Sequence, residues 1–451
     1  MRIAFVAMSG IRACDAELLE LGLTLPGFVE RSRQIASLPS LGLLTLAGLT
    51  PAHHDVRYHE VRDLDDDVNN RDLYDDVDLV AISTFTAQAR ESYVIADRFR
   101  AAGVPVVMGG LHVTARPDEA LQHADAVVVG EGEAVWPDVL ADAEAGRLRP
   151  RYDARAGHGG REWDLADAPM PRYDLLDMDR YNRITVQTTR GCPWRCEFCA
   201  SSILLTPRYK HKPVERVLAE IDRVCELWPR PFIEFADDNS FVDRGYWYRL
   251  LPELAKRNTR WFTETDVRVG DDDRLLELMH AAGCKQVLLG LEAPTAEGTR
   301  GLELKTDFKR RSAPKVPAAV ANIQRHGIRV NGCFILGLDG QTTDVFDAVA
   351  DYAETLNLFD VQITLQTPFP GTPLYQRLAA AGRLLEPDAW HRCTLFDLTY
   401  RPDPMTAEQL VGGFHGLAKR LYGRDATARR RAAFRKSARG HVPALDPPEQ
   451  P

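Results

Sequence analysis

Short, continuous apolar runs alternate with longer amphipathic stretches along residues 1–150. Apolar runs without polar alternation are typical of strands in a parallel sheet covered on both faces, and here they are Ile3–Val6, Val56–His59, Leu79–Ser83, Val104–Met108 and Ala126–Val129. Helical spacing of apolar residues predicts the intervening helices Leu41–Leu49, Ala87–Ala102 and Glu133–Ala145. We therefore predict an α/β fold, with a doubly wound parallel sheet over residues 1–150 that binds its ligand at the carboxyl ends of the strands.

The same alternation returns over residues 183–385. Apolar runs predict strands at Phe232–Phe235, Trp261–Thr263, Gln286–Leu289, Ile328–Leu336 and Val361–Leu365. Helices are predicted between them at Leu275–Ala282, Val316–His326 and Val345–Leu356. With the segment Arg183–Thr188, which is also predicted to be a strand, this makes a run of about six strand–helix units.

The remaining segments differ in composition. Residues 151–182 are rich in Arg, Asp, Gly and Pro, so we interpret them as a linker. Residues 386–436 are predicted to form a mostly helical C-terminal segment, and the proline-rich residues 437–451 a disordered tail.

Composition and charge exclude several functional classes. The net charge of −9 argues against a nucleic-acid partner. No apolar run approaches the ~18 residues of a membrane span, so we expect no transmembrane segment. Eight cysteines in 451 residues do not form the dense framework of a secreted disulfide protein, and we expect a cytoplasmic protein with reduced thiols.

Three of the cysteines are closely spaced. Cys192, Cys196 and Cys199 form a C-x3-C-x2-C run. A structural zinc ion takes four ligands, and the local sequence supplies only these three. Three thiolates can instead hold three irons of a 4Fe–4S cluster and leave the fourth iron open for a substrate. A structural metal knuckle or three reduced core thiols are the alternatives.

This spacing, with the aromatic Phe198 before the third cysteine, resembles the signature of the radical S-adenosylmethionine (SAM) enzymes. The resemblance implies that Cys192, Cys196 and Cys199 are the catalytic cluster ligands and that SAM binds the open iron. One electron then cleaves SAM to methionine and a 5′-deoxyadenosyl radical. It also implies that residues 183–385 form a partial (β/α)6 TIM barrel.

Glycine and polar residues collect where the N-terminal strands end, and glycine there allows a ligand to approach the backbone. Together with the segment Pro39–Leu44, these loops resemble the Rossmann-like cobalamin-binding domain of the class B radical SAM enzymes. The resemblance implies a set of cobalamin-binding residues: Leu41, Ser83, Thr84, Gly109, Gly110, His112, Gly130, Glu131 and Glu133.

The histidines depart from one cobalamin pattern. None of the twelve lies in the Asp-x-His-x-x-Gly motif that ligates cobalt, so we expect no histidine below the metal. His112 lies in a loop where the family has a histidine. A hydrogen bond that orders the loop is the interpretation we favour for it.

The barrel resemblance also suggests a SAM site, because TIM-barrel chemistry lies at the carboxyl ends of strands. Phe198 would lie against the adenine through its backbone. The other expected contacts come from the ends of four strands: Asp237 and Asp238, Glu264 and Arg268, Glu292, and Gly337. An acidic residue at a strand end is also a common helix cap or a partner of a neighbouring arginine.

The segment Pro368–Tyr375 resembles an element late in the class B barrel, in particular in the hopanoid C-2 methylase-like and anaerobic tetrapyrrole cyclase-like branch. The family implies a cobalamin-dependent C-methyltransferase that acts on an unactivated carbon of a lipid, tetrapyrrole or natural-product intermediate. Methylcobalamin would donate the methyl group, and reduced flavodoxin or ferredoxin the electron. One alternative is a cyclase, ring-contracting enzyme or oxidoreductase without methyl transfer, and another is a non-catalytic cobalamin or Fe–S sensor.

Overall fold

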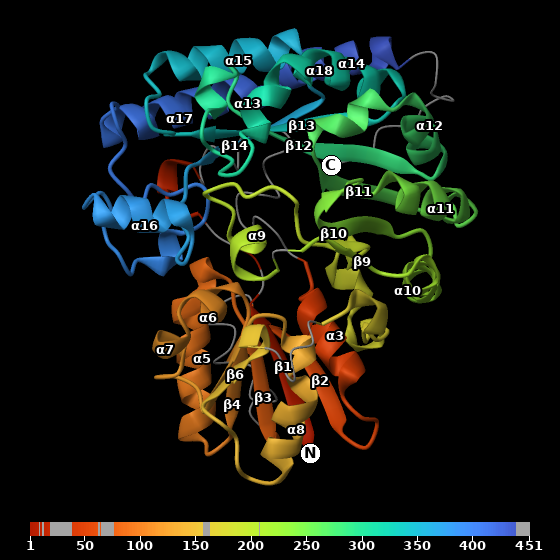
Figure 1. The fold of residues 1–451 in the computed structure, drawn as a ribbon, viewed down its shortest axis with the longest axis vertical. Helices are drawn as coiled ribbons and strands as arrows, with labels where there is room; N and C mark the ends of the chain where they lie inside the picture. Colours follow the sequence, from red (N-terminus) through yellow and green to blue (C-terminus); the bar gives the residue numbers. More distant parts are fainter. Residues whose placement is uncertain are drawn as a thin grey trace.

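The computed structural model describes residues 1–8, 10, 13–18, 38–61, 64, 76–156, 163–206 and 208–438. Two six-stranded parallel sheets lie one above the other, with the cluster loop and helix α9 (Ala200–Leu204) between them (Figure 1). The lower sheet is that of residues 1–153, and the carboxyl ends of its strands point toward the upper sheet. The ligand-binding edge of the first domain therefore faces the second.

The first sheet has the strand order β2-β1-β3-β4-β5-β6. The strands are β1 (Arg2–Met8), β2 (Asp55–Val61), β3 (Leu79–Ser83), β4 (Val106–Gly109), β5 (Ala126–Val129) and β6 (Arg151–Asp153). The strands β3 and β5 coincide with the predicted ones. The strand β6 was not predicted: it pairs with β5 and so places the first residues of the expected linker in this sheet.

Helices cover both faces of this sheet, which confirms the doubly wound prediction. One face packs against α3 (Leu41–Leu49) and α8 (Trp136–Glu144). The other packs against α5 (Ala89–Ala101), α6 (Leu111–Ala115) and α7 (Pro117–Ala120). Ser40 caps α3, since its Oγ accepts a hydrogen bond from the backbone N–H of Leu43.

The second sheet runs in chain order, β7-β10-β11-β12-β13-β14, with every pair parallel. Such a curved sheet with outer helices is the expected partial barrel. Its strands are β7 (Ile184–Val186), β10 (Phe232–Ser240), β11 (Arg260–Thr265), β12 (Cys284–Glu292), β13 (Arg329–Leu336) and β14 (Asp360–Leu365). Its main covering helices are α10 (Val214–Leu227), α11 (Arg244–Ala255), α12 (Asp273–Ala281), α14 (Val316–Arg325) and α15 (Asp344–Thr355).

Glycines end two of these helices for a steric reason. Gly283 has φ +91°, and a Cβ there would lie 1.9 Å from the carbonyl oxygen of Thr259. Only glycine fits this turn from α12 into β12. Gly327 ends α14 in the same left-handed conformation, with φ +77°.

The C-terminal segment follows α16 (Pro373–Ala380) and is helical in α17 (Ala407–Tyr422) and α18 (Arg424–Ser437). Thr406 and Gln409 begin α17 with a capping box, and its apolar face joins the barrel core. The expected tail lies outside the described residues after residue 438.

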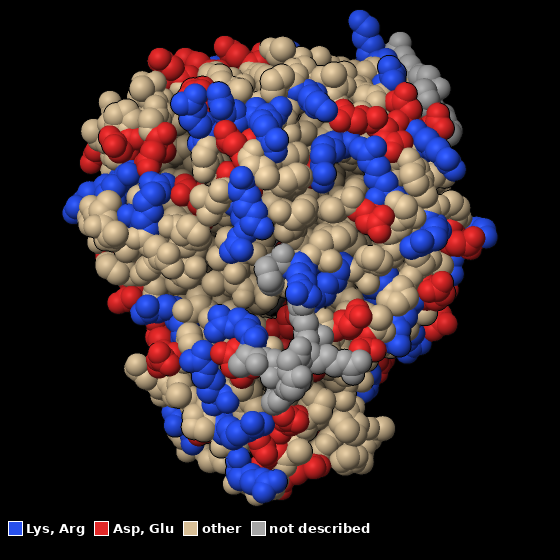
Figure 2. Space-filling view, in the orientation of Figure 1, with Lys and Arg blue, Asp and Glu red and all other residues tan. Residues whose placement is uncertain are grey.

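Among the described helices, none is long and apolar enough to cross a membrane. Acidic and basic side chains are interspersed over the face shown in Figure 2.

Candidate cluster and cofactor site

The three motif cysteines lie on one loop, which runs from β8 (Thr189–Arg190) to the start of α9. The loop is pinned by Glu303, whose carboxylate accepts a hydrogen bond from the backbone N–H of Arg195 at 3.1 Å. The three sulfur atoms do not all lie within 4.8 Å of one another. Thiolates on a single zinc ion would be about 3.8 Å apart. The spacing therefore fits a multi-iron cluster better than one zinc ion.

Two consecutive aspartates at the end of β10 fix this loop. The carboxylate of Asp237 accepts hydrogen bonds from the backbone N–H groups of Thr188 and Thr189, each at 2.9 Å, and from the hydroxyls of Thr188 and Ser240. Protein donors thus bond both carboxylate oxygens of Asp237, and its expected contact with SAM stays a prediction. Asp238 accepts hydrogen bonds from the backbone N–H of Gly191 at 2.6 Å and from the hydroxyl of Ser201. It also lines a cavity between the two sheets.

A further carboxylate, that of Asp266, also contacts the loop. It accepts hydrogen bonds from the indole of Trp194 at 3.0 Å, from Asn239 at 3.0 Å and from Arg268 at 2.7 Å. The guanidinium of Arg268 also lies over the Trp194 ring, 4.8 Å from its centroid, and Phe308 stacks on that ring. These contacts place Arg268 against the cluster loop, and its expected contact with SAM stays a prediction.

Asn239 connects this network to the cluster position. Its Nδ2 donates to Asp266 and lies 3.6 Å from Sγ of Cys192. Such a donor stabilises the more negative, reduced form of a cluster. We expect Asn239→Leu to lower the reduction potential by about 40 mV, the one-electron equivalent of a ~1 kcal/mol hydrogen bond. Potentiometric titration followed by electron paramagnetic resonance measures it, and an unchanged potential would contradict the assignment.

Glu292 ends β12 in a strained conformation, with φ +65° in the left-handed region. It is buried, and its carboxylate pairs with Nζ of Lys309 at 2.7 Å. Lys309 also donates to the carbonyl oxygen of Gly290 at 2.8 Å. The ion pair lies close enough to Cys196 to influence the pKa of its thiol. No sequence pattern identified Lys309 as a functional residue.

Glu264 differs from these carboxylates because its side chain makes no hydrogen bond or ion pair with the described residues. It is accessible to solvent although protein surrounds it, as expected for a side chain inside a barrel. Burial, followed by the charges of Glu234, Asp238 and Glu292, raises its pKa to about 7. An unpartnered carboxylate among acidic neighbours suits a cationic ligand, and SAM carries an ammonium and a sulfonium group.

This pKa predicts a pH dependence of SAM binding. Glu264 gains its charge as pH rises through about 7, so the attraction to a cation is weak below that pH and full above it. We expect the affinity of the cluster-loaded protein for SAM to rise about fivefold more between pH 6 and 7.5 than that of Glu264→Gln. Isothermal titration calorimetry in both proteins measures this. Equal pH profiles would show that Glu264 does not face SAM.

Phe198 and Gly337 both lie near Tyr400. The Phe198 ring packs against apolar groups that include Leu338 and Tyr400. Gly337 has φ +84°, and a Cβ there would lie 2.2 Å from the Tyr400 hydroxyl, which donates to the Gly337 carbonyl. Tyr400 therefore requires glycine at this position, and the expected contact of Gly337 with SAM stays a prediction. A backbone contact of Phe198 with SAM stays a prediction.

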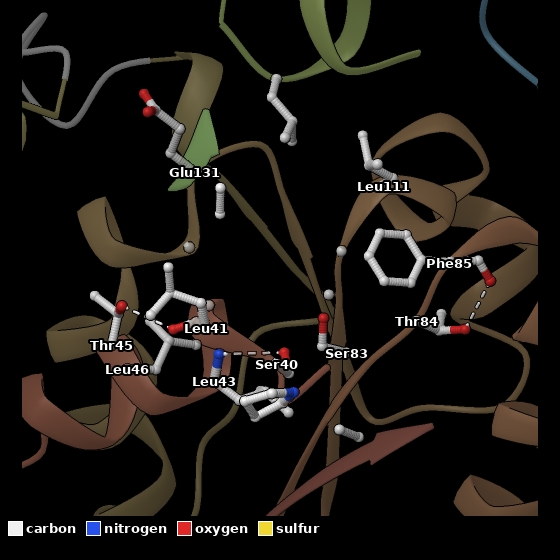
Figure 3. A pocket seen from close by; sticks show the side chains of 18 of the residues that line it. Ser40, Leu41, Leu43, Thr45, Leu46, Ser83, Thr84, Phe85, Leu111 and Glu131 are labelled. Atoms are coloured by element: carbon white, nitrogen blue, oxygen red, sulfur yellow. Dashed lines mark hydrogen bonds between the residues drawn. The ribbon is translucent and has the colours of Figure 1, made fainter. Parts of the chain in front are cut away.

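One cavity of about 520 Å³ joins the two sheets. Leu41 and Leu46 border it from α3, while Ser83, Phe85 and Leu111 border it from the opposite side (Figure 3). Of the expected cobalamin residues, these line the cavity: Leu41, Ser83, Thr84, Gly109, Gly110, Gly130, Glu131 and Glu133. Residues of the second sheet, among them Glu234 and Asp238, close its other side.

His112 is the exception among the expected cobalamin residues. It is fully buried away from this cavity, and its Nε2 lies 3.0 Å from the Tyr93 hydroxyl and 3.4 Å from Glu119. Its ring meets the edge of Trp390. His112 is thus not among the residues that line the cavity. The favoured hydrogen bond is present, but it joins α6 to α5 and α7 and does not order a loop.

A buried ion-pair network connects the two halves of the cavity. Arg190, two residues before Cys192, donates to Glu131 at 2.9 Å and to Glu133 at 2.7 Å. Lys210 pairs with the other oxygen of Glu131 at 2.8 Å. Burial alone would raise the pKa of Glu133, but Arg190 outweighs it and lowers that pKa. Sequence reasoning found the glutamates and missed the arginine.

The comparisons with known families divide the chain as the two sheets do. Residues 36–140 match the B12 binding domain, and residues 186–353 match the radical SAM superfamily. The chain thus combines the two domains of the cobalamin-dependent radical SAM enzymes. Its cofactors are a 4Fe–4S cluster, SAM and cobalamin. The sensor alternative is thereby set aside.

The relatives of this radical SAM enzyme include methylases and a cyclase. Bacteriochlorophyllide d C-12(1)-methyltransferase of Chlorobaculum tepidum is 26% identical over 86% of this chain and 84% of its own length. Hopanoid C-2 methylase of Rhodopseudomonas palustris is 27% identical over 78% and 66%. Anaerobic magnesium-protoporphyrin IX monomethyl ester cyclase of Rubrivivax gelatinosus is 26% identical over 68% and 59%.

The radical SAM methyltransferase TsrM of Kitasatospora setae, solved with cobalamin and a 4Fe–4S cluster, has the same fold. It superposes with a TM-score of 0.67 at 16% identity, covering 93% of this chain and 88% of that one. The radical SAM enzyme described here thus has the two-domain architecture of that structure.

Proposed function

We propose that the protein is a C-methyltransferase that acts on an unactivated carbon of a large, mostly apolar substrate. The single observation that supports this most is the shared cavity. It places the strand-end loops of the B12 domain opposite Asp238 and Ser201, which hold the cluster loop. When bound, the cluster supplies the electron that cleaves SAM, and cobalamin carries the methyl group.

The chain's own residues would hold and enclose these groups. Leu41, Ser83, Gly110 and Glu131 would border the corrin, since all four line the cavity. Glu264 would hold the cationic part of SAM. The Arg190 network would keep the two halves in register, since small displacements of reacting atoms cost large factors in rate.

We propose a tetrapyrrole or a polycyclic lipid as the substrate class. Phe85, Leu111 and Leu205 give the cavity an apolar wall, and Phe85 is 55% exposed. Methylases of a bacteriochlorophyllide and of a hopanoid are among the relatives. Both of those substrates are large fused or linked ring systems.

The test is anaerobic turnover of the protein loaded with cluster and cobalamin. Candidate tetrapyrroles and hopanoids are incubated with methyl-deuterated SAM and a reductant, and products are read by mass spectrometry. Methyl transfer predicts a product that carries the deuterated methyl group and two SAM consumed per turnover. Product without the label, with one SAM consumed, would instead favour the cyclase alternative, which a cyclase relative supports. Cys196→Ala should abolish 5′-deoxyadenosine formation.

We propose reduced flavodoxin or ferredoxin, in the cytoplasm, as the electron donor. Leu304 is 50% exposed and donates its N–H to the carbonyl of Arg195, next to the cluster ligand Cys196. Four exposed basic residues surround this segment: Arg300, Lys305, Arg310 and Arg311. An acidic carrier would be steered to such a face.

Charge reversal tests this docking face. We expect Lys305→Glu/Arg311→Glu to slow reduction by flavodoxin about tenfold at low salt and to leave reduction by dithionite unchanged. Stopped-flow absorbance of the cluster measures both rates. Arg435→Glu/Lys436→Glu on α18 is the matched control with the same charge change. Equal slowing in both double variants would attribute the effect to net charge alone.

A further inference from the structure

Three metal-type donors meet at the end of the first sheet that faces away from the cavity. His53 and His54 lie in the turn between α3 and β2, and Glu144 is the last residue of α8. Nε2 of His53 lies 3.3 Å from Oε1 of Glu144, and Nε2 of His54 lies 3.4 Å from the same oxygen. One ligand atom from each residue falls within 4.8 Å of the others. The proposed methyl transfer uses none of these residues.

These separations match the geometry of zinc. Zinc binds histidine nitrogen and carboxylate oxygen at about 2.0–2.2 Å in a tetrahedron, which places neighbouring ligand atoms about 3.3–3.5 Å apart. Both nitrogen–oxygen distances already have that value. Hydrogen bonding alone would not require two imidazoles to converge on one carboxylate oxygen.

The surroundings also suit a cation. Glu144 lies at the C-terminal end of α8, where the helix dipole attracts positive charge. The Met1 amine lies 3.2 Å from Nδ1 of His54, which leaves Nε2 toward Glu144. The His53 side chain is 65% exposed, so water can complete the tetrahedron.

We propose that His53, His54 and Glu144 form a zinc site that fastens the turn after α3 to the end of α8. Both helices border the cofactor cavity at their other ends, through Leu41 and Trp136. They are already joined near the turn, where the indole of Trp136 donates to Thr50 at 2.9 Å. A zinc ion would complete this connection and stabilise the domain, because a ligand that binds only the folded state raises its stability.

The experiment uses the full chain loaded with cluster and cobalamin, so that the motif cysteines are occupied. Zn²⁺ is added under anaerobic conditions, excess is removed by gel filtration, and zinc per chain is measured by inductively coupled plasma mass spectrometry. The variants are His53→Ala and Glu144→Gln, both at exposed positions that folding does not require. His123→Ala is the matched control: His123 pairs with Asp97 at 2.9 Å and has no third donor among the described residues.

The proposal predicts one zinc more in the parent protein and in His123→Ala than in His53→Ala or Glu144→Gln. It also predicts that zinc raises the unfolding midpoint of the first two proteins and of neither site variant. The same zinc content and the same midpoint shift in all four proteins would overturn it. Cobalamin content, read from the absorption spectrum of each sample, verifies that the variants are folded.

Discussion

Arg190→Met is expected to reduce methyl transfer about 100-fold while the protein still binds SAM at its cluster. The substitution removes the cation that joins Glu131 and Glu133 of the B12 domain to the cluster loop. Glu133 is then buried without an ion-pair partner, which costs about 3–5 kcal/mol of stability. The two cofactors lose their register, and misplacement of about 1 Å between reacting groups costs about 100-fold in rate. Urea unfolding and the ratio of methylated product to 5′-deoxyadenosine measure the two effects.

Arg420→Met is the matched control for this variant. Arg420 also pairs with two carboxylates, Asp347 and Asp351, but all three side chains are exposed. Exposed pairs contribute about 0–1 kcal/mol, so we expect little change in stability or activity. Arg190→Lys should be intermediate, since lysine keeps the charge without the two-pronged geometry. If Arg190→Met behaved as Arg420→Met does, the network would have no positioning role.

Lys309→Met is the second substitution with a large expected effect. Glu292 is buried in a strained backbone conformation, and Lys309 is its partner. Burial alone would lower the pKa of Lys309, but Glu292 outweighs it and raises that pKa, so Lys309 is charged throughout the physiological range. Removing the cation leaves an uncompensated buried charge and should cost about 3–5 kcal/mol. We also expect SAM affinity to change, because Glu292 lies beside Glu264.

Lys256→Met isolates the contribution of burial. Lys256 pairs with Glu253 at the same 2.7 Å, but the two side chains are 66% and 45% exposed. Denaturant unfolding should separate the two variants by more than about 2 kcal/mol. Similar losses would mean that the Lys309 pair is not held in a low-dielectric environment.

Local patterns predicted the architecture well because strands and helices follow from periodicity. Leu41–Leu49 and Ala126–Val129 were predicted to the residue, and the cysteine spacing identified the cluster loop. The glycine-rich loops after the strands of the first sheet predicted the position of the cavity, because parallel strands place their carboxyl ends at one edge of a sheet. These features depend on residues that are near one another in the sequence.

Side-chain partners depend on residues that folding brings together, and there the predictions were less accurate. Asp237 was predicted correctly to be at a strand end, yet Thr188 and Ser240 occupy its carboxylate. Arg268 stacks on Trp194, and Tyr400, from beyond the barrel, fills the space at Gly337. No sequence pattern around Lys309 or Arg190 indicates that either residue forms an ion pair with a glutamate distant in the sequence. A short sequence window gives the position of a functional group but not its contacts.

The central claim is that one cavity brings a SAM-cleaving cluster and a bound cobalamin together. The most direct measurement is anaerobic reconstitution with iron, sulfide and hydroxocobalamin, followed by gel filtration, absorption spectroscopy and a dithionite assay for 5′-deoxyadenosine. We predict that cobalamin stays with the protein and that the same preparation cleaves SAM. Cleavage of SAM by protein that retains no cobalamin would contradict the account.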